Sequence, residues 1–315
     1  MKIVIPGGTG QVGTILARAF HERAHEVTVL SRRPGSAPWR VIAWDGETPG
    51  DWAGEFEGSD AVINLAGRSV NCRYTPENRR SIKESRVKST RAVGEAIAQA
   101  AAPPRVWLQM STATIYEHRY DSPNDEATGV IGGSEPKAPD TWRFSIDVAT
   151  SWERAVDEAV TPGTRKVKMR AAMVMSPDRG GVFDTLLGLV RRGLGGTSGD
   201  GRQYVSWIHD EDFVRSVFWL IERDGFSGPV NLSAPGPVPN ADFMRALREA
   251  WGTRVGLPAT KWMLEVGALF LRSETELILK SRRVIPGLLL REGFVFKFAD
   301  WPEAARDLCR RWRAA

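Results

Sequence analysis

The sequence predicts an α/β protein, in which a doubly wound parallel sheet with helices on both faces is joined to a small C-terminal α/β lobe. In the first 175 residues, short β-branched apolar runs alternate with helical patterns, as in successive βαβ units. A glycine-rich turn, 7–13, follows the first run. Beyond residue 175, glycine-rich loops, helices and short strands follow. We therefore expect a first domain over 1–175, whose sheet also receives later segments, and a smaller substrate lobe over 176–315 with a distinct tail from about 235.

The strands and helices of the first domain follow from apolar spacing and from proline positions. A helix must follow the first strand, because Val12, Ile15, Leu16, Ala19 and Phe20 recur at helical spacing. Further helices are expected over 82–100, which Pro103 and Pro104 would stop, and over 144–153. The candidate strands are Ile3–Ile5, Glu26–Leu30, Val41–Ala43, Ala61–Leu65, Val106–Met110 and Val167–Val174.

Composition excludes several classes of protein. The 315 residues are 42% hydrophobic and 26% charged and include 12 tryptophans, which describes a globular protein and excludes disorder, collagen and small disulfide scaffolds. No apolar stretch approaches the length of a membrane span, and the chain starts as a strand rather than a signal peptide. Cys72 and Cys309 are too few for a disulfide framework or a thiolate metal cage. We therefore expect a cytoplasmic protein.

The basic charge does not by itself predict a nucleic-acid partner. The formal charge is +5 and the isoelectric point is about 9.4. The basic pairs are scattered along the chain without a nucleic-acid-binding motif, so solvated helix faces explain them. We expect a small-molecule substrate, no nucleic acid and no membrane partner, and the sequence leaves a monomer or a homodimer open.

The glycine-rich turn has the spacing of a dinucleotide-binding loop. A strand runs into Gly7-Gly8-Thr9-Gly10-Gln11-Val12-Gly13 and then into a helix, which is a G-x-x-G-x-x-G variant of the Rossmann fingerprint in its required context. Gly7 would permit the tight turn, Gly10 the approach to a pyrophosphate, and Gly13 the packing of helix on strand. The helix N-terminus would add free N–H donors. The candidate cofactor residues here are Gly7, Thr9, Gly10, Gln11, Val12 and Gly13.

The end of the second strand favours NADP over NAD. An NAD site would place a carboxylate there, on the ribose 2′-hydroxyl, whereas this chain has Ser31, Arg32 and Arg33. A hydroxyl and two guanidinium groups suit a 2′-phosphate, so NADPH should be preferred over NADH, the alternative being two solvated surface arginines. After the third strand, Asp45 is a candidate for the adenine edge. After the fourth, Leu65, Ala66 and Gly67 are candidates for the adenosine ribose.

These residues resemble the short-chain dehydrogenase/reductase superfamily, extended type. More closely, the whole chain resembles its atypical NAD(P)-dependent epimerase-like (nucleoside-diphosphate-sugar-epimerase-related) family, which carries a C-terminal domain of unknown function. The resemblance implies a nucleotide-binding Rossmann domain and oxidoreductase or epimerase chemistry on a polar small molecule. Its motifs are Gly7–Gly13, Asn64–Gly67, Ser85-Arg86 with Thr90, Gly180-Gly181, Gly199–Gln203, Trp207-Ile208-His209 with Asp212, Asn231–Pro235, and Pro286 with Gly293–Phe296.

The catalytic pair of the superfamily is missing. Its active members use a tyrosine and a lysine four residues later, and no Y-x-x-x-K occurs in this sequence. Matching Glu153 to the acidic residue after the lysine puts Ser145 and Ala149 at the two positions, so the standard proton transfer is not expected.

Three other side chains are the candidates for chemistry. Ser111 and Tyr116 would donate hydrogen bonds to a carbonyl, and Arg86 would hold an anion. Each has a structural alternative, namely the end of a strand, packing, and an ion pair with Glu84 or another acid.

In the second lobe, Gln203 and Trp207 are candidates for the substrate pocket. Nearby, His209 and Asp212 suit a structural junction, at which Asp210 or Asp212 caps a helix beginning near Phe213.

Two further questions follow from the motifs. His21-Glu22-Arg23-Ala24-His25 matches H-E-x-x-H, but the histidines straddle the end of a helix and no third ligand follows, so we expect no metal.

The sequence leaves two functions open. The protein is either an NADP-dependent reductase or epimerase with a non-standard active site, or a non-catalytic NADP-binding sensor or scaffold.

Overall fold

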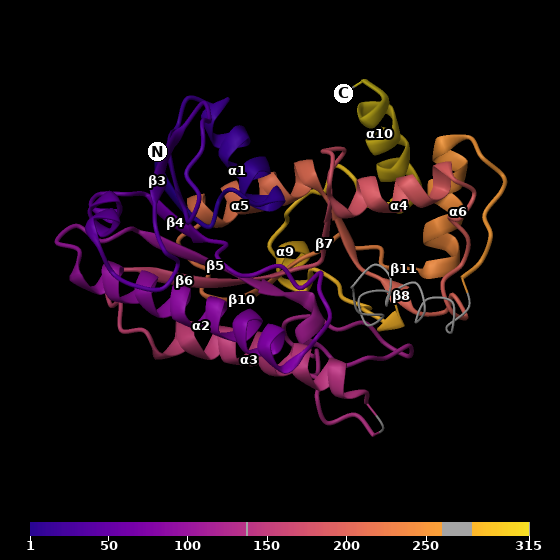
Figure 1. The fold of residues 1–315 in the computed structure, drawn as a ribbon, viewed down its shortest axis with the longest axis horizontal. Coiled ribbons are helices and arrows are strands. Elements are labelled where there is room, and N and C mark those ends of the chain that lie inside the picture. Colours follow the sequence, from indigo (N-terminus) through magenta and orange to yellow (C-terminus); the bar gives the residue numbers. More distant parts are fainter. Residues whose placement is uncertain (137, 260–278, 315) are drawn as a thin grey trace.

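The computed structural model describes residues 1–136, 138–259 and 279–314 (Figure 1). Its centre is a seven-stranded sheet in which every pair of neighbours is parallel. The order across the sheet is β10 (Gly228–Leu232), β6 (Arg165–Ala171), β5 (Val106–Thr112), β4 (Ala61–Asn64), β1 (Lys2–Pro6), β2 (Glu26–Ser31) and β3 (Arg40–Ala43). The predicted fold class is confirmed.

Helices cover both faces of the sheet (Figure 1). One face packs against α1 (Gln11–His21) and α5 (Asp210–Glu222), and the other against η1 (Asp51–Phe56), α2 (Pro76–Gln99) and α3 (Asp140–Glu158). Because successive side chains of a strand point to opposite faces of the sheet, one apolar strand contributes to the cores on both faces. In β1, Ile3 and Ile5 join the core under α1 and α5, whereas Val4 joins the core under α2.

The helix α2 begins six residues before the predicted start at Ile82. Thr75 is its N-cap, and the Thr75 side chain accepts a hydrogen bond from the backbone N–H of Asn78. Pro76 takes the first helical position, where its missing N–H costs nothing. Capping therefore extends the helix across a polar stretch that apolar spacing does not mark.

One predicted strand is two strands. The run Val167–Val174 breaks at Ala172, after which β7 (Met173–Met175) pairs with β9 (Trp207–His209) in a separate sheet. The backbone N–H of Ala172 still donates to Leu232 at the end of β10, and that of Met173 donates to Ser206. The chain thus changes partner without changing its apolar pattern, which is why periodicity alone predicts a single strand.

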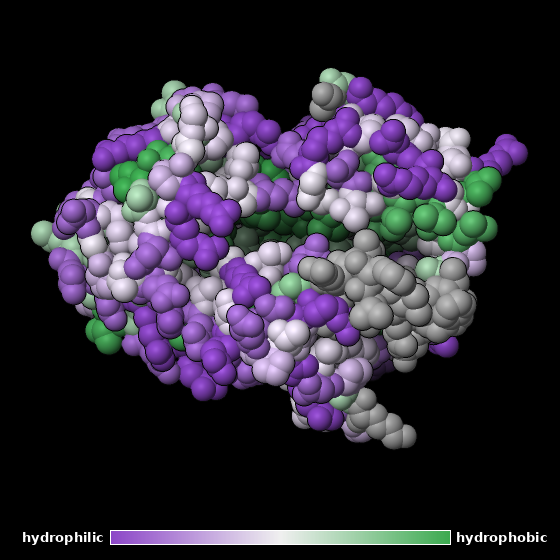
Figure 2. Space-filling view, viewed as in Figure 1, coloured by the Kyte–Doolittle hydropathy of each residue, from purple (hydrophilic) through white to green (hydrophobic). Residues whose placement is uncertain are grey.

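The second lobe packs three helices around large apolar side chains. They are α4 (Val182–Arg191), α6 (Asn240–Trp251) and α10 (Trp301–Ala314), beside the short pair β8 (Tyr204–Val205) and β11 (Val238–Pro239). Their shared core includes Phe183, Trp207, Phe243, Trp301 and Trp312. In the space-filling view, hydrophobic residues gather in the hollow between the two halves and beside α6 (Figure 2).

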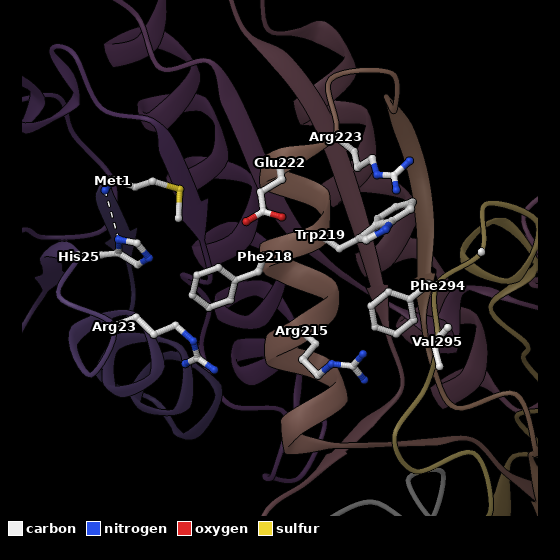
Figure 3. A pocket seen from close by; sticks show the side chains of 11 residues that line it. Met1, Arg23, His25, Arg215, Phe218, Trp219, Glu222, Arg223, Phe294 and Val295 are labelled. Carbon is white, nitrogen blue, oxygen red and sulfur yellow. Dashed lines mark hydrogen bonds between the residues drawn. The ribbon is translucent and has the colours of Figure 1, made fainter.

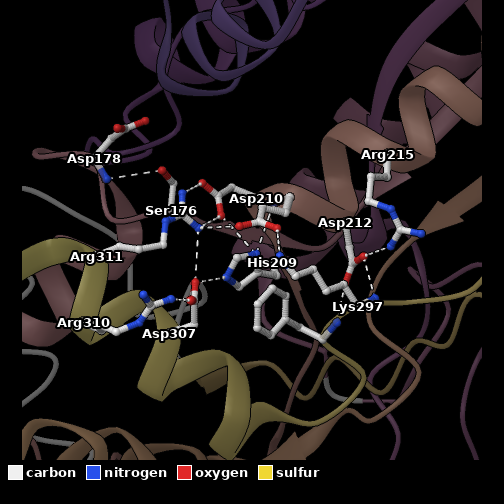
Figure 4. Close-up of polar contacts among 12 residues, drawn as sticks. Ser176, Asp178, His209, Asp210, Asp212, Arg215, Lys297, Asp307, Arg310 and Arg311 are labelled. Carbon is white, nitrogen blue, oxygen red and sulfur yellow. Dashed lines mark hydrogen bonds and ion pairs between the residues drawn. The ribbon is translucent and has the colours of Figure 1, made fainter.

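The helix α10 is attached to the start of α5 by buried polar contacts (Figure 4). Arg311 donates to both carboxylate oxygens of Asp210, at 2.8 and 2.7 Å. The fully buried ring of His209 stacks on Phe298 and lies 3.2 Å from the Asp307 carboxylate. Burial lowers the pKa of His209.

The cap of α5 differs from the prediction. The helix starts at Asp210, and its N-cap is His209, whose ring accepts the backbone N–H of Glu211. Asp212 instead accepts the backbone N–H groups of Lys297 and Phe298, both at 2.8 Å. The junction is structural, but histidine rather than aspartate caps the helix.

Across the described ranges, no helix combines the length and the apolar character that crossing a bilayer requires.

Candidate functional site

The glycine loop between β1 and α1 has close backbone packing on two sides. Gly7 has a φ of +76°, and a Cβ there would lie 2.6 Å from the backbone of Ala66. A Cβ on Gly13 would lie 2.4 Å from the Cα of Gly8, so only glycine lets α1 approach the turn this closely. A Cβ on Gly10 would meet nothing within 4 Å, and α1 starts there without a side-chain cap. The loop therefore presents free N–H donors to open space.

A cleft of about 670 Å³ opens beside this loop, at the carboxyl ends of β1, β2, β3 and β4. This is the edge at which open parallel sheets bind ligands. Most of the predicted cofactor residues line it, whereas Gln11, Val12 and Gly13 lie in the first turn of α1, outside the lining. The lining residues are Gly7, Thr9, Gly10, Leu30, Ser31, Arg32, Arg33, Trp44, Asp45, Gly46, Glu47, Leu65, Ala66, Gly67, Arg68 and Ser85.

Ser31 organises the turn that presents the two arginines. Its hydroxyl donates to the carbonyl of Arg33 and accepts the backbone N–H of the same residue, each at 3.1 Å. It also lies 3.2 Å from the hydroxyl of Thr9, on the glycine loop. Ser31 itself is buried, whereas Arg32 and Arg33 are exposed at the mouth of the cleft. Two cations thus stand at one end of the cleft.

Asp45 lines the cleft, but its carboxylate is hydrogen-bonded within its own turn. The carboxylate accepts from the hydroxyl and backbone N–H of Thr48 and from the backbone N–H of Glu47. These hydrogen bonds, the Thr48 hydroxyl first, lower the pKa of Asp45. Beside it, Trp44 lines the same wall and packs against Trp52, with ring centroids 4.9 Å apart. Trp44 is a lining residue that the sequence reasoning missed, although a tryptophan directly after a strand was a visible signal.

Ser111 and Tyr116 belong to a buried polar network that also holds Glu153, Arg170 and Asn231. The Ser111 hydroxyl donates to Glu153 at 2.7 Å, and the Tyr116 hydroxyl donates to Asn231 at 2.9 Å. Arg170 donates to both carboxylate oxygens of Glu153, at 2.8 and 2.7 Å, and to the Tyr116 oxygen at 2.9 Å. Neither Ser111 nor Tyr116 lines the cleft, and burial raises the pKa of Tyr116. This geometry favours their structural alternatives, and catalytic roles for them stay predictions.

The position matched to the catalytic lysine is apolar and closed. Ala149 is fully buried in a cluster with Ala113, Ile115, Tyr116 and Val284. Alanine itself has no ammonium group that would hold a ribose or lower the pKa of a neighbouring hydroxyl. The buried ammonium group of Lys280 donates to the carbonyl of Thr114, which lies between Ala113 and Ile115 in sequence. Alanine at position 149 therefore cannot take the role that the lysine has in active members of the superfamily.

Arg86 lies at the border of the cleft. It stands on α2 directly after Ser85, which lines the cleft, and its guanidinium packs against Gly67. No ion pair joins it to Glu84 or to any other acid in the residues that the structure describes. The ion-pair alternative for Arg86 is wrong for these residues.

Gln203 and Trp207 are buried inside the second lobe. The Gln203 amide donates to the carbonyl of Ser198 at 2.9 Å. The Trp207 indole donates to the carbonyl of Gly236 at 3.1 Å and packs edge-on against Trp301. Neither side chain lines the cleft, so their roles in a substrate pocket stay predictions.

A second hollow, of about 800 Å³, lies at the opposite edge of the sheet (Figure 3). Met1 and His25, which precede β1 and β2, mark its position. This is the amino edge of the strands, away from the edge where such sheets bind ligands. The remaining lining residues are Arg23, Arg215, Phe218, Trp219, Glu222, Arg223, Gly293, Phe294 and Val295. The glycine-loop cleft is therefore the candidate site.

The H-E-x-x-H residues do not gather into a site. His21, in α1, lies edge-on to Trp39, whereas His25 lies 3.2 Å from the terminal amino group of Met1. In the described ranges, no group of three or more histidine, cysteine, aspartate or glutamate side chains is arranged to hold a metal ion.

Comparisons with known proteins agree with this geometry. The family model of the NAD dependent epimerase/dehydratase family matches residues 3–232, and that of the domain of unknown function DUF1731 matches residues 259–308. The chain is similar to the human epimerase family protein SDR39U1, at 31% identity over 98% of this chain and 99% of the relative. It is also similar to an epimerase family protein of Staphylococcus aureus, at 29% identity over 98% of this chain and 99% of the relative.

Solved structures show the same fold. The crystal structure of human SDR39U1 with NADPH superposes with a TM-score of 0.85 at 29% identity, covering 98% of this chain and 99% of that one. A nucleoside-diphosphate sugar epimerase from Corynebacterium glutamicum superposes with a TM-score of 0.73 at 27% identity, covering 98% of this chain and 58% of that one. With the family model spanning most of the chain and the glycine-loop cleft in place, this protein belongs to the NAD-dependent epimerase/dehydratase family, in its atypical short-chain dehydrogenase/reductase branch with a DUF1731 C-terminal domain.

Proposed function

We propose that this protein binds NADPH in the glycine-loop cleft and acts as an atypical reductase- or epimerase-like enzyme on a polar small molecule. The observation that carries the proposal is the pairing of an open, uncapped α1 N-terminus with Arg32 and Arg33 at the same cleft. The NADPH in the human relative supports the same choice of cofactor. A cytoplasmic location, expected from the two cysteines, is part of the proposal.

The cleft fits the parts of a dinucleotide. The space in front of Gly10 and the N–H groups of the first turn of α1 suit the pyrophosphate. Arg32 and Arg33 suit the 2′-phosphate, because guanidinium groups bind phosphate through charge-assisted hydrogen bonds. The walls at Leu65 and Ala66 suit the adenosine. Bound NADPH would supply a hydride, and the protein would supply binding and orientation.

Changing the two arginines tests this assignment. In isothermal titration calorimetry, Arg32→Ala combined with Arg33→Ala should weaken NADPH binding at least tenfold, since two charge-assisted contacts to the phosphate are lost, while NADH binding changes less than twofold. Arg40→Ala is the matched control, because Arg40 is exposed on β3, pairs with Glu55 and does not line the cleft. Equal losses for the two cofactors would show that Arg32 and Arg33 are surface residues only.

A second candidate function is a non-catalytic NADPH-binding sensor or scaffold. The specific observation in its favour is the closed apolar cluster around Ala149, together with the hydroxyls of Ser111 and Tyr116 that bond to Glu153 and Asn231. A screen of carbonyl and sugar-nucleotide substrates with NADPH separates the two. Steady oxidation of NADPH by the purified protein would exclude the sensor, and binding without turnover across the screen would support it.

A further inference from the structure

Arg86 is held between the loop after β4 and the helix α3. Its guanidinium carbon lies 4.9 Å from the centre of the Trp152 ring. A Cβ on Gly67 would lie 3.2 Å from the Cγ and Cζ atoms of Arg86. The guanidinium therefore contacts both an aromatic ring and the backbone of Gly67, which lines the cleft.

Only one of its nitrogens is satisfied by the described part of the chain. Nη1 donates to the carbonyls of Arg68 and Ile82, at 3.0 and 2.9 Å. Nε and Nη2 make no hydrogen bond with any described residue, and no described carboxylate lies within ion-pair distance. Burial lowers the pKa of Arg86 to about 10, so the group is still a cation at neutral pH.

Three other arginines with buried or half-buried side chains have both terminal nitrogens hydrogen-bonded. Arg170 and Arg311 each form a two-point pair with a carboxylate, on Glu153 and Asp210. Arg165 has no two-point carboxylate partner, but its two terminal nitrogens donate to three carbonyls around the end of α5, those of Leu220, Ile221 and Phe226. Arg86 differs because its Nη2, in addition to its Nε, has no acceptor among the described residues.

That edge has the geometry of an oxyanion receptor. The N–H groups on Nε and Nη2 of a guanidinium point the same way and bind the two oxygens of a planar carboxylate by parallel hydrogen bonds. We propose that the Nε and Nη2 edge of Arg86 binds a carboxylate of the substrate, which makes the substrate class a carboxylic acid. The inference rests on the proposed function, in which the pyrophosphate is assigned to the loop around Gly10 and the 2′-phosphate to Arg32 and Arg33.

Nitrogen NMR of the full chain with labelled arginine tests the proposal. The Arg86 Nε–H resonance is assigned by its loss in Arg86→Lys, and in Arg86→Gln as a second variant. With NADPH saturating and ionic strength held with chloride, acetate should move this resonance downfield along a saturable curve. Arg91→Lys is the matched control on the same helix, because Arg91 is exposed and points to Glu158, so the Arg86 response should remain.

Three results would overturn the proposal. If NADPH alone takes the resonance to its final position and acetate has no further effect, the anion is a phosphate of the cofactor. If inorganic phosphate shifts the resonance at lower concentration than acetate, the ligand is a phosphate and not a carboxylate. If no anion moves it, Arg86 only supports the loop. The response is read on wild-type protein, and one folded variant of the two, Arg86→Lys or Arg86→Gln, is enough to assign the resonance.

Failure of the proposed function is distinguishable from failure of this site. If the protein does not bind NADPH, the calorimetric titration shows it directly, while the acetate titration without cofactor still reports on Arg86. A saturable acetate response in that case would support the anion site at Arg86 and exclude only NADPH binding.

Discussion

Replacing Arg170 with methionine tests the buried ion pair between Arg170 and Glu153. Arg170 and Glu153 expose 10% and 8% of their side chains, and their two hydrogen bonds are 2.8 and 2.7 Å long. Without Arg170, the Ser111 hydroxyl is the one side-chain donor that the described residues leave to the Glu153 carboxylate. Leaving one charge of a buried pair unmatched costs about 3 to 5 kcal/mol. For a chain of 315 residues this corresponds to a fall in Tm of about 5 to 8 °C.

The assay is urea unfolding followed by tryptophan fluorescence, with two comparisons. Glu153→Gln combined with Arg170→Met removes both charges and keeps an acceptor for Ser111, so most of the lost free energy of unfolding should return. Lys168→Met is the matched control on the same strand, because Lys168 pairs with Asp157, whose side chain is 60% exposed, and should cost at most about 1 kcal/mol. A loss below about 1 kcal/mol for Arg170→Met, or strictly additive losses in the double variant, would refute the reasoning.

Three further outcomes are expected. Gly13→Ala should abolish NADPH binding in calorimetry, because its Cβ would fall 2.4 Å from Gly8 and displace the loop, and unchanged affinity would contradict this. Because burial lowers the pKa of His209, the unfolded chain takes up a proton first, so Tm should fall as pH drops below about 6.5 and fall less steeply in His209→Gln. Cys309 is buried with its pKa raised to about 11, so a disulfide reagent at pH 8 should label Cys72 alone until urea is added, and two fast thiols in the native protein would disagree.

The geometry of the glycine-loop half could be predicted from the sequence because its signals are local. The tight turn, the open approach and the close packing of α1 each depend on one glycine in a seven-residue run. The clustering of Arg32 and Arg33 with that run follows from the parallel sheet, which brings the carboxyl ends of β1 and β2 together.

The catalytic candidates could not be placed in the same way. Ser111 and Tyr116 have the right chemistry, but their hydroxyl partners Glu153 and Asn231 lie 42 and 115 residues away in sequence. Whether a hydroxyl faces a cleft or a buried carboxylate depends on those distant partners, and no periodicity encodes them. Trp44 was missed although it directly follows β3, because a single aromatic residue carries no spacing pattern that assigns it to a cleft.

The attachment of α10 has a consequence for how the chain is made. Synthesis proceeds from the N-terminus, and domains generally fold as they emerge. Here Asp210, at the first turn of a helix that packs on the central sheet, receives its counter-charge from Arg311, 101 positions later. The start of α5 therefore acquires its buried counter-charge only after Arg311 has been synthesised. A chain that lacks Arg311 would leave the Asp210 carboxylate beside His209 without this partner, so the fold at α5 depends on a residue 101 positions later.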